Sequence, residues 1–329
     1  MTVRIGIIGV GVMGADHARI VASETAGAKL QVLADADEKR VKALAAELGA
    51  ETAVTDPMAV INDPSVDAVV IASPDATHQA LTLACIAARK PVLCEKPLAP
   101  TAAECLAVVK AETALGRRLV QVGYMRRFDP GYAGMKAACR SGDFGRALML
   151  HCIHRNVSAP DWFTSGMAIT NSAVHEIDIA RWLLDCELTS VRVLKPAASP
   201  AAPIFLVFET SGGHIVDVEM FNHAVYGYDV RGELVCETGT VSLRSPVSIE
   251  INGALKQSVT HPADWRPRFA SAYRIQMRAW IDASQTGSAT GASARDGYAA
   301  GAVAEAGLEA LATGHMAKVT LVEKPALYC

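Results

Sequence analysis

Val3-Arg4-Ile5-Gly6-Ile7-Ile8-Gly9-Val10-Gly11-Val12-Met13-Gly14 is the stretch that decides the fold. Its first six residues predict a short buried strand. The next six form a Gly-x-Gly-x-x-Gly turn that leads into a helical stretch over residues 15–22. Such a turn can be purely structural, but the strand–turn–helix context favours a dinucleotide-binding turn, in which a pyrophosphate approaches the helix N-terminus. The residues expected to contact the cofactor here are Gly9, Gly11, Val12, Met13 and Gly14.

The second predicted strand, residues 30–34, ends in an acidic residue, Asp35. It follows the glycines by about twenty positions, where a carboxylate in such folds accepts hydrogen bonds from the adenosine ribose. The alternative role, capping of the following helix, fits Asp37 better. Because no arginine directly follows Asp35, a 2′-phosphate would meet two carboxylates. The sequence therefore predicts NAD rather than NADP.

A third strand end carries further candidates. Residues 66–72 form an apolar run, typical of a central parallel strand, that leads to Ser73-Pro74-Asp75-Ala76-Thr77-His78 and a helix over residues 79–88. Asp75 or Thr77 is expected to cap that helix. For His78 the alternative to cofactor contact is capping or packing. The candidates for cofactor contact in this stretch are Ser73 and His78.

Cys94-Glu95-Lys96-Pro97 follows a short apolar strand over residues 91–93. Lys96 therefore lies at the carboxyl end of a strand, where open α/β sheets bind ligands. A lysine there can polarise an alcohol or carbonyl oxygen or shuttle its proton. The alternative is a solvated surface lysine, which residue type alone favours. The flanking patterns favour the functional interpretation.

The order of elements predicts two domains. Strands and helices alternate through a helix over 102–115 and a strand over 119–122, which predicts a doubly wound parallel sheet of the Rossmann type in residues 1–122. Residues 123–329 are expected to form an α+β domain with a large, mostly antiparallel open sheet, whose last helix packs back toward the first domain. Its expected strands cover 147–154, 191–194, 204–208, 215–221, 229–236, 241–243 and 249–251, its helices 269–286 and 294–312, and a loop 197–203.

Composition excludes several classes of function. The 329 residues carry a net charge of −3 without a basic block, so neither nucleic acid nor an anionic membrane is an expected partner. No apolar run is long enough to span a bilayer, and no signal peptide is visible, which predicts a cytoplasmic protein. The eight cysteines are scattered and none is in Cys-x-x-Cys spacing, so reduced thiols are expected and no metal site.

Residues 169–184 contain the remaining polar candidates. Asn171 and His175 are four residues apart, and a helix would place them on one face. A single histidine on an amphipathic helix is more often structural than catalytic. The rest of the chain changes that weighting.

Taken together, these stretches resemble the Gfo/Idh/MocA oxidoreductase family, and within it the members that act on inositols. The resemblance covers nearly the whole chain. Besides the glycine turn and Asp35, the stretches that carry it are Cys94-Glu95-Lys96-Pro97-Leu98-Ala99, residues 119–129 with Met125-Arg126-Arg127, His151-Cys152-Ile153-His154-Arg155-Asn156, Val174-His175-Glu176-Ile177-Asp178 and Tyr226-Gly227-Tyr228-Asp229. The stretches around Lys96 and Met125 are specific, whereas the glycine turn is not.

The resemblance implies hydride transfer between NAD and a ring carbinol of a cyclitol, with myo-inositol oxidised to its 2-keto form. It implies that Lys96 holds the reacting hydroxyl and His175 takes its proton. It also implies a homo-oligomer, a dimer or tetramer. Alternatives are a surface ion pair for Arg126 and Arg127 and a core position for Tyr228. Implied substrate contacts are Lys96, Met125, Arg126, His154, Asn171, Ser172, His175 and Tyr228, and Glu95 and Lys96 join the cofactor contacts.

The chain departs from the family pattern at Asn171, where the family usually has an aspartate. An amide can still hydrogen-bond, but it cannot supply the charge that supports an imidazolium. Two alternatives stay open for this reason. One is a related dehydrogenase for another sugar, aminocyclitol or keto-cyclitol. The other is a non-catalytic NAD-binding sensor.

Overall fold

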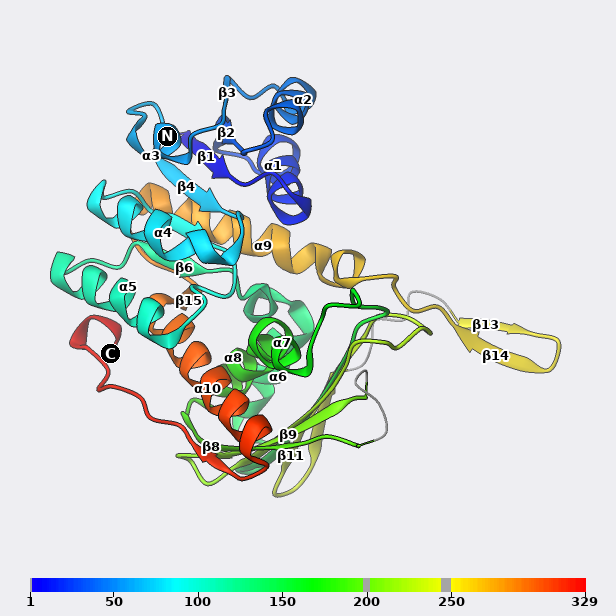
Figure 1. Ribbon diagram of the computed structural model, residues 1–329. Coiled ribbons are helices and arrows are strands. Elements are labelled where there is room, and N and C mark those ends of the chain that lie inside the picture. Colours follow the sequence, from blue (N-terminus) through cyan, green and yellow to red (C-terminus); the bar gives the residue numbers. More distant parts are fainter. Residues whose placement is uncertain (1, 198–201, 244–249) are drawn as a thin grey trace. The chain divides into compact units, whose positions relative to one another are not determined.

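The computed structural model describes residues 2–197, 202–243 and 250–329 (Figure 1). Two compact units divide the chain. The first unit comprises Met1–Phe128, Ser271–Gly301 and Val322–Cys329, and the second unit comprises Asp129–Ala270 and Ala302–Leu321. The domain boundary expected between residues 122 and 123, and the packing expected of the last helix, stay predictions.

The first unit is built on a seven-stranded sheet in the order β15-β6-β5-β4-β1-β2-β3. Every neighbouring pair is parallel except β15 with β6. This confirms the predicted Rossmann-like parallel sheet, while the short strands β3 and β15 were not predicted. The strands are β1 (Val3–Ile8), β2 (Ala28–Ala34), β3 (Thr52–Val54), β4 (Ala68–Ile71), β5 (Val92–Cys94), β6 (Val120–Val122) and β15 (Ala292–Ser293).

Local signals set the helix ends of this unit. The Asp37 carboxylate accepts a hydrogen bond from the Arg40 N–H and begins α2, as predicted. Thr101 and Glu104 form a capping box at the start of α5. The expected cap of α4 was wrong, because the Thr77 hydroxyl bonds the Pro74 carbonyl and the Ser73 hydroxyl instead. The helices are α1 (Val12–Glu24), α2 (Glu38–Leu48), α3 (Pro57–Asn62), α4 (His78–Ala87) and α5 (Ala102–Leu115), with 3-10 turns η1 (Asp75–Thr77), η2 (Met125–Phe128) and η4 (Ala326–Tyr328).

The second unit contains a seven-stranded sheet in the order β12-β11-β7-β10-β9-β8-β16. Its neighbours are antiparallel except β7 with β10, which confirms the predicted mostly antiparallel sheet. Burial alternates along β9 and β10, so one face is covered and the other is not. The strands are β7 (Ala147–Arg155), β8 (Leu188–Leu194), β9 (Ile204–Thr210), β10 (Ile215–Phe221), β11 (Asp229–Cys236), β12 (Thr240–Leu243) and β16 (Ala317–Lys318), with a separate hairpin of β13 (Glu250–Gly253) and β14 (Lys256–Val259). The predicted loop 197–203 and strand 249–251 lie partly outside the described residues.

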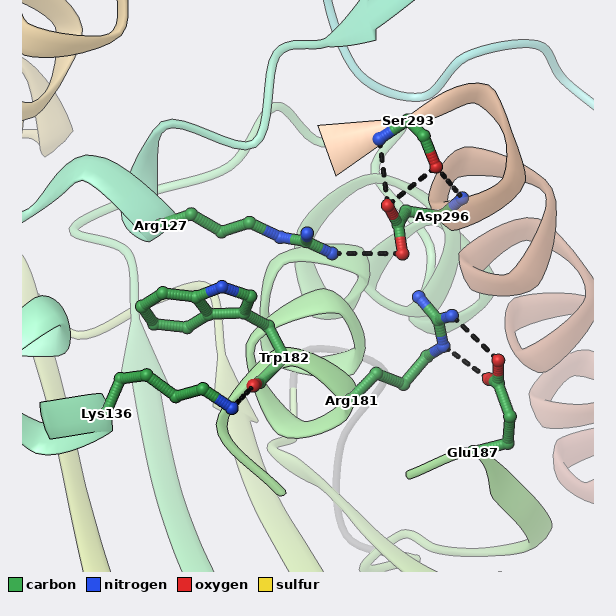
Figure 2. A network of polar contacts seen from close by, with 7 residues as sticks. All are labelled: Arg127, Lys136, Arg181, Trp182, Glu187, Ser293 and Asp296. Carbon is green, nitrogen blue, oxygen red and sulfur yellow. Dashed lines mark hydrogen bonds and ion pairs between the residues drawn. The ribbon is translucent and has the colours of Figure 1, made fainter. Parts of the chain in front are cut away.

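Helices pack against the covered face of this sheet. Unpredicted α6 (Pro130–Ser141) begins at Asp129, whose carboxylate accepts from the Gly131 and Tyr132 N–H groups. Lys136 on α6 donates to the Trp182 carbonyl (Figure 2). It also donates to the Leu183 carbonyl at 3.1 Å, and so binds the C-terminal end of α8. The other helices are α7 (Ser165–Met167), a π-helix η3 (Ala168–Ala173) and α8 (Val174–Leu184). Two long helices, α9 (Trp265–Thr286) and α10 (Ala294–Thr313), contribute residues to both units. Within residues 2–197, 202–243 and 250–329, no helix is long and apolar enough to cross a membrane.

Candidate functional site

The glycine turn between β1 and α1 leaves room for an anion. A Cβ at Gly9, whose φ is +85°, would lie 2.5 Å from the Ser73 backbone nitrogen, and a Cβ at Gly14 would lie 1.8 Å from the Gly9 carbonyl oxygen. A Cβ at Gly11 would meet no other heavy atom of the described residues within 4 Å. Gly11 is also the N-cap of α1, and in the described part of the chain no side chain caps this helix. The open N-terminus fits the pyrophosphate of a dinucleotide.

Asp35 directly follows β2. It accepts hydrogen bonds from the Val10 and Asp37 backbone N–H groups at 2.8 and 2.9 Å. Arg40 on α2 donates to it at 2.9 Å. Burial opposes the charge, but these donors together lower the pKa of Asp35 below its ordinary value. The position of Asp35 suits binding of an adenosine ribose. Its partner Arg40, five residues further along the chain, was not predicted from the sequence.

Glu95 lies buried next to the backbone of Lys96. Its Oε1 contacts His17 Nε2 at 2.7 Å, and its Oε2 accepts the Lys96 backbone N–H at 3.2 Å. Burial opposes ionisation, but His17 and Lys96 lower the pKa of the Glu95 carboxyl. The absence of a side chain at Gly123 is part of this arrangement, because a Cβ there would lie 2.7 Å from Glu95 Oε2. Glu95 thus supports the turn that carries Lys96, and His17 was not predicted because nothing local marks it.

The segment after β6 brings two neighbouring arginines into different surroundings. Met125 and Arg126 in η2 are 2% and 1% exposed. Arg127 pairs with Asp296 at 3.2 Å, and Asp296 in turn accepts from the Ser293 N–H and hydroxyl at 2.8 Å (Figure 2). Of the two arginines for which an ion pair was the alternative role, Arg127 forms one, with Asp296.

In the second unit, three of the predicted substrate residues form an aromatic cluster. The ring of His154, on β7, lies 6.4 Å from that of His175 on α8 and 5.9 Å from that of Tyr228. His154 Nδ1 contacts the Glu176 carboxylate at 3.0 Å, and both side chains are almost fully buried. Two imidazoles and a phenol within this distance can exchange hydrogen bonds and protons with a polyol.

Asn171 and Ser172 lie in the π-helix η3 rather than in an α-helix. His175 lies in the first turn of α8, which follows η3 directly, so the expected shared face of Asn171 and His175 stays a prediction. The Thr170 hydroxyl donates to the Asn171 side-chain oxygen at 2.8 Å. This contact orients the amide, and Thr170 was not among the predicted residues.

Among the described residues, no group of three or more His, Cys, Asp or Glu side chains could hold a metal ion. The open helix N-terminus with Asp35 can accommodate a dinucleotide, and the imidazoles of the second unit can take part in acid–base chemistry.

Comparison with known proteins agrees with this chemistry. Residues 3–124 match the family described as an oxidoreductase family with an NAD-binding Rossmann fold, and residues 132–242 match the GFO/IDH/MocA C-terminal domain. The chain belongs to the Gfo/Idh/MocA oxidoreductase family. As a member of that family it is an NAD-binding oxidoreductase, and the residues of the β1–α1 turn and Asp35 fit the cofactor.

Relatives of known name extend the comparison over the full length. Inositol 2-dehydrogenase 1 of Saccharopolyspora erythraea is 53% identical over 335 residues, which cover 100% of this chain and 99% of the relative. Inositol 2-dehydrogenase of Streptomyces avermitilis is 46% identical over 330 residues, which cover 98% of this chain and 96% of the relative. The crystal structure of myo-inositol dehydrogenase from Lactobacillus casei in complex with NAD(H) and myo-inositol has a TM-score of 0.95, with 29% identity and 100% coverage of both chains.

Proposed function

We propose that the protein is an NAD-dependent dehydrogenase that oxidises a ring carbinol of a cyclitol, with myo-inositol converted to its 2-keto form. The observation that carries this proposal is the full-length similarity to inositol 2-dehydrogenases, in a chain that retains both a lysine at the end of β5 and a histidine at the start of α8. The similarity to a structure that holds NAD(H) and myo-inositol supports the same substrate class.

The reaction assigns a role to each of these residues. When bound, NAD supplies the hydride acceptor. Lys96 holds the reacting hydroxyl, and neutral His175 accepts the hydroxyl proton as the carbon is oxidised. The buried Glu95 fixes the backbone of Lys96 through its contact with the Lys96 N–H. Met125 packs near the ring, and the other hydroxyls are bound by Arg126, His154, Asn171, Ser172 and Tyr228.

The contact between His154 and Glu176 suits this role. With Nδ1 against a carboxylate, His154 is held in one orientation, and its Nε2 is the ring atom that serves other partners. A neutral polyol offers many hydroxyls and no charge, so its recognition needs several such oriented groups. The pair therefore supports a polyol over a charged substrate.

Asn171 is compatible with a second class of substrate, one that presents a carbonyl group. The Thr170 hydroxyl donates to the Asn171 amide oxygen, and an amide carries N–H donors that a carboxylate lacks. A substrate that presents a carbonyl, such as a keto-cyclitol, would use those donors. Another sugar or aminocyclitol is the alternative substrate, and a sensor without catalysis is the alternative function.

We also infer a homo-oligomer, a dimer or tetramer, that works in the cytoplasm. The uncovered face of the second unit's sheet exposes apolar side chains at Leu194, Phe205 and Ile215. Two pairs of charged or ionisable side chains connect the neighbouring strands β7 and β10. They are His151 with Asp217 and Arg155 with Glu219. Apolar side chains exposed together on one sheet face are a candidate surface for contact with a second copy of the chain. All eight cysteines, each within the described ranges, are free thiols, which suits a reducing compartment.

The test is a substrate panel with the purified full-length chain. Formation of reduced nicotinamide is followed by absorbance with NAD and myo-inositol, scyllo-inositol, glucose or glycerol, and NAD affinity is measured by calorimetry. Turnover with a cyclitol and little with glycerol is expected. Tight NAD binding without turnover on any polyol would favour the sensor.

A further inference from the structure

His78 occupies an unusual position for a buried histidine. It is the first residue of α4 and only 1% exposed. Its Nδ1 lies 2.7 Å from the Pro97 carbonyl oxygen, and its Nε2 lies 2.9 Å from the Ser73 carbonyl oxygen. Ser73 follows β4 and Pro97 follows β5, and these two strands are neighbours in the parallel sheet. The ring therefore bridges the loops at the carboxyl ends of two adjacent strands.

Both partners determine the protonation of the ring. A carbonyl oxygen can only accept a hydrogen bond, so each ring nitrogen must carry a proton for both contacts to form. A neutral imidazole has one N–H and would leave one buried nitrogen lone pair facing a carbonyl lone pair, which is unfavourable. The two contacts are thus satisfied together only by the imidazolium.

The electrostatic surroundings agree with the charged form. Burial opposes the charge, but the Cys94 side chain and the two carbonyls outweigh it and raise the pKa of His78 to about 10. Cys94 faces the ring from β5. Cys85, two turns along α4, is held neutral because burial raises the pKa of its thiol to about 12. Asp75 lies in the turn before the ring, and Glu95 and Lys96 lie in the turn that the ring contacts.

The sign of the effect on stability follows from this shift. A histidine whose pKa is raised by folding contributes stability that is complete below its ordinary pKa of 6.5. That contribution is lost only as the pH rises through the folded value of about 10. The raised pKa of His78 therefore favours the doubly protonated ring at neutral pH.

We propose that His78 is a doubly protonated positioning residue, which ties the Ser73 loop to the Lys96–Pro97 turn and so fixes the backbone of Lys96 for turnover. This role differs from direct contact with the cofactor, because both ring nitrogens already face the protein's own backbone. The catalytic consequence rests on the proposed function of Lys96, whereas the charge state of the ring does not.

Two substitutions and a matched control test the catalytic consequence. His78→Phe keeps a ring but removes both donors, and His78→Gln keeps one amide with two N–H donors. Thr82→Val, on the same helix and equally buried, is the control. A misplacement of about 1 Å can cost roughly 10²-fold in rate, so a fall of that order in kcat is expected for His78→Phe, with KM and NAD affinity changed only a few-fold.

The glutamine variant should recover about tenfold of that loss and stay below the control, since its single amide nitrogen can restore one of the two contacts. A kcat of His78→Phe equal to that of Thr82→Val would overturn the positioning role. If the phenylalanine variant does not fold, the comparison of His78→Gln with Thr82→Val decides: a glutamine variant as active as the control would overturn the role.

A second measurement reads the charge state without any turnover. The full-length protein is labelled with ¹⁵N-histidine, and the His78 resonances are assigned by their loss in His78→Gln. Two protonated ring nitrogens at pH 8.5 are expected, where an ordinary histidine is neutral. A single-proton tautomer at that pH would overturn the proposal even in an active enzyme. A charged ring in a chain without dehydrogenase activity would leave the bridge intact and contradict the proposed function instead.

Discussion

The glycine turn of residues 9–14 and the π-helix of residues 168–173 both lead into a helix that carries proposed function, but different forces shape them. In the glycine turn, Gly9 has a positive φ and Gly14 lies against the Gly9 carbonyl, whereas a Cβ at Gly11 would meet open space. The π-helix contains neither glycine nor proline. Its residues Ala168, Ile169 and Ala173 are buried, and a Cβ at Gly307 of α10 would lie 2.9 Å from Ile169. Motifs fix the first region, and packing fixes the second.

The largest expected effect comes from breaking the glycine turn. Gly14→Ala drives a methyl group against the Gly9 carbonyl and should destabilise the protein by about 3 kcal/mol or more, with loss of NAD binding. Gly11→Ala is the matched control, because its methyl group meets open space. This variant should keep the midpoint of thermal unfolding and lose only NAD affinity. Equal unfolding midpoints for the two variants would contradict the local account of the turn.

The second effect concerns the chemistry at the end of β5. Lys96→Ala should lower kcat by about 10²- to 10⁴-fold while NAD affinity changes little. Steady-state kinetics together with calorimetry separates these quantities. Lys90→Ala is a control, since Lys90 lies just before the same strand and donates to the Asp63 carbonyl. A Lys96→Ala variant that kept most of its kcat would make Lys96 a bystander.

The secondary structure was predicted where its signals are local and was missed where they are not. The parallel sheet, the Asp37 cap and the turn around Lys96 were predicted, because their signals lie within a few residues of the structure they specify. Helix α6 was missed although Asp129 and Pro130 mark its start. The short strand β15 has only two residues, and its pairing with β6 depends on a partner about 170 positions away in sequence.

Candidate site residues divide in the same way. Asp35 and Lys96 could be read from the strand ends that carry them. The contacts of His17 with Glu95, Thr170 with Asn171 and His154 with Glu176 could not, because each depends on a tertiary approach or on a π-turn. Sequence patterns named the residues, but their partners came from packing.

The third prediction tests the π-helix through Asn171. Asn171→Asp keeps the shape and the Thr170 contact and adds a charge that supports the imidazolium of His175. We expect kcat/KM for myo-inositol to rise about tenfold near neutral pH, equivalent to roughly 1.4 kcal/mol, with less gain at alkaline pH where the imidazole is neutral without help. The measurement is the pH–rate profile of both proteins.

Asn171→Ala serves as the control, since it removes the amide without adding charge. If Asn171→Asp loses activity on every cyclitol while the wild type is active, the amide is a specific substrate contact. The substrate would then be one to which the Asn171 amide forms better hydrogen bonds than a carboxylate does.

The smallest effect is expected at Arg40, whose substitution tests the role of Asp35 in choosing between NAD and NADP. Its pair with Asp35 is half exposed, and such pairs contribute about 0–1 kcal/mol. Arg40→Gln should lower kcat/KM for NADP by about two- to fivefold, because a 2′-phosphate loses its nearest cation, and leave the value for NAD nearly unchanged. The Asp35 carboxylate stays charged in the variant near neutral pH, since its pKa is lowered by the Asp37 and Val10 N–H groups as well. Better use of NADP than of NAD by the wild type would contradict the assignment of Asp35.

The most direct test of the central claim follows the hydride itself. The wild-type protein is incubated with NAD and myo-inositol deuterated at C2, and the reduced nicotinamide is isolated and weighed by mass spectrometry. The account predicts one deuterium in the reduced cofactor, together with a 2-keto cyclitol as product. Reduced cofactor without deuterium, or no reduction at all under conditions where NAD is bound, would contradict oxidation of this ring carbinol.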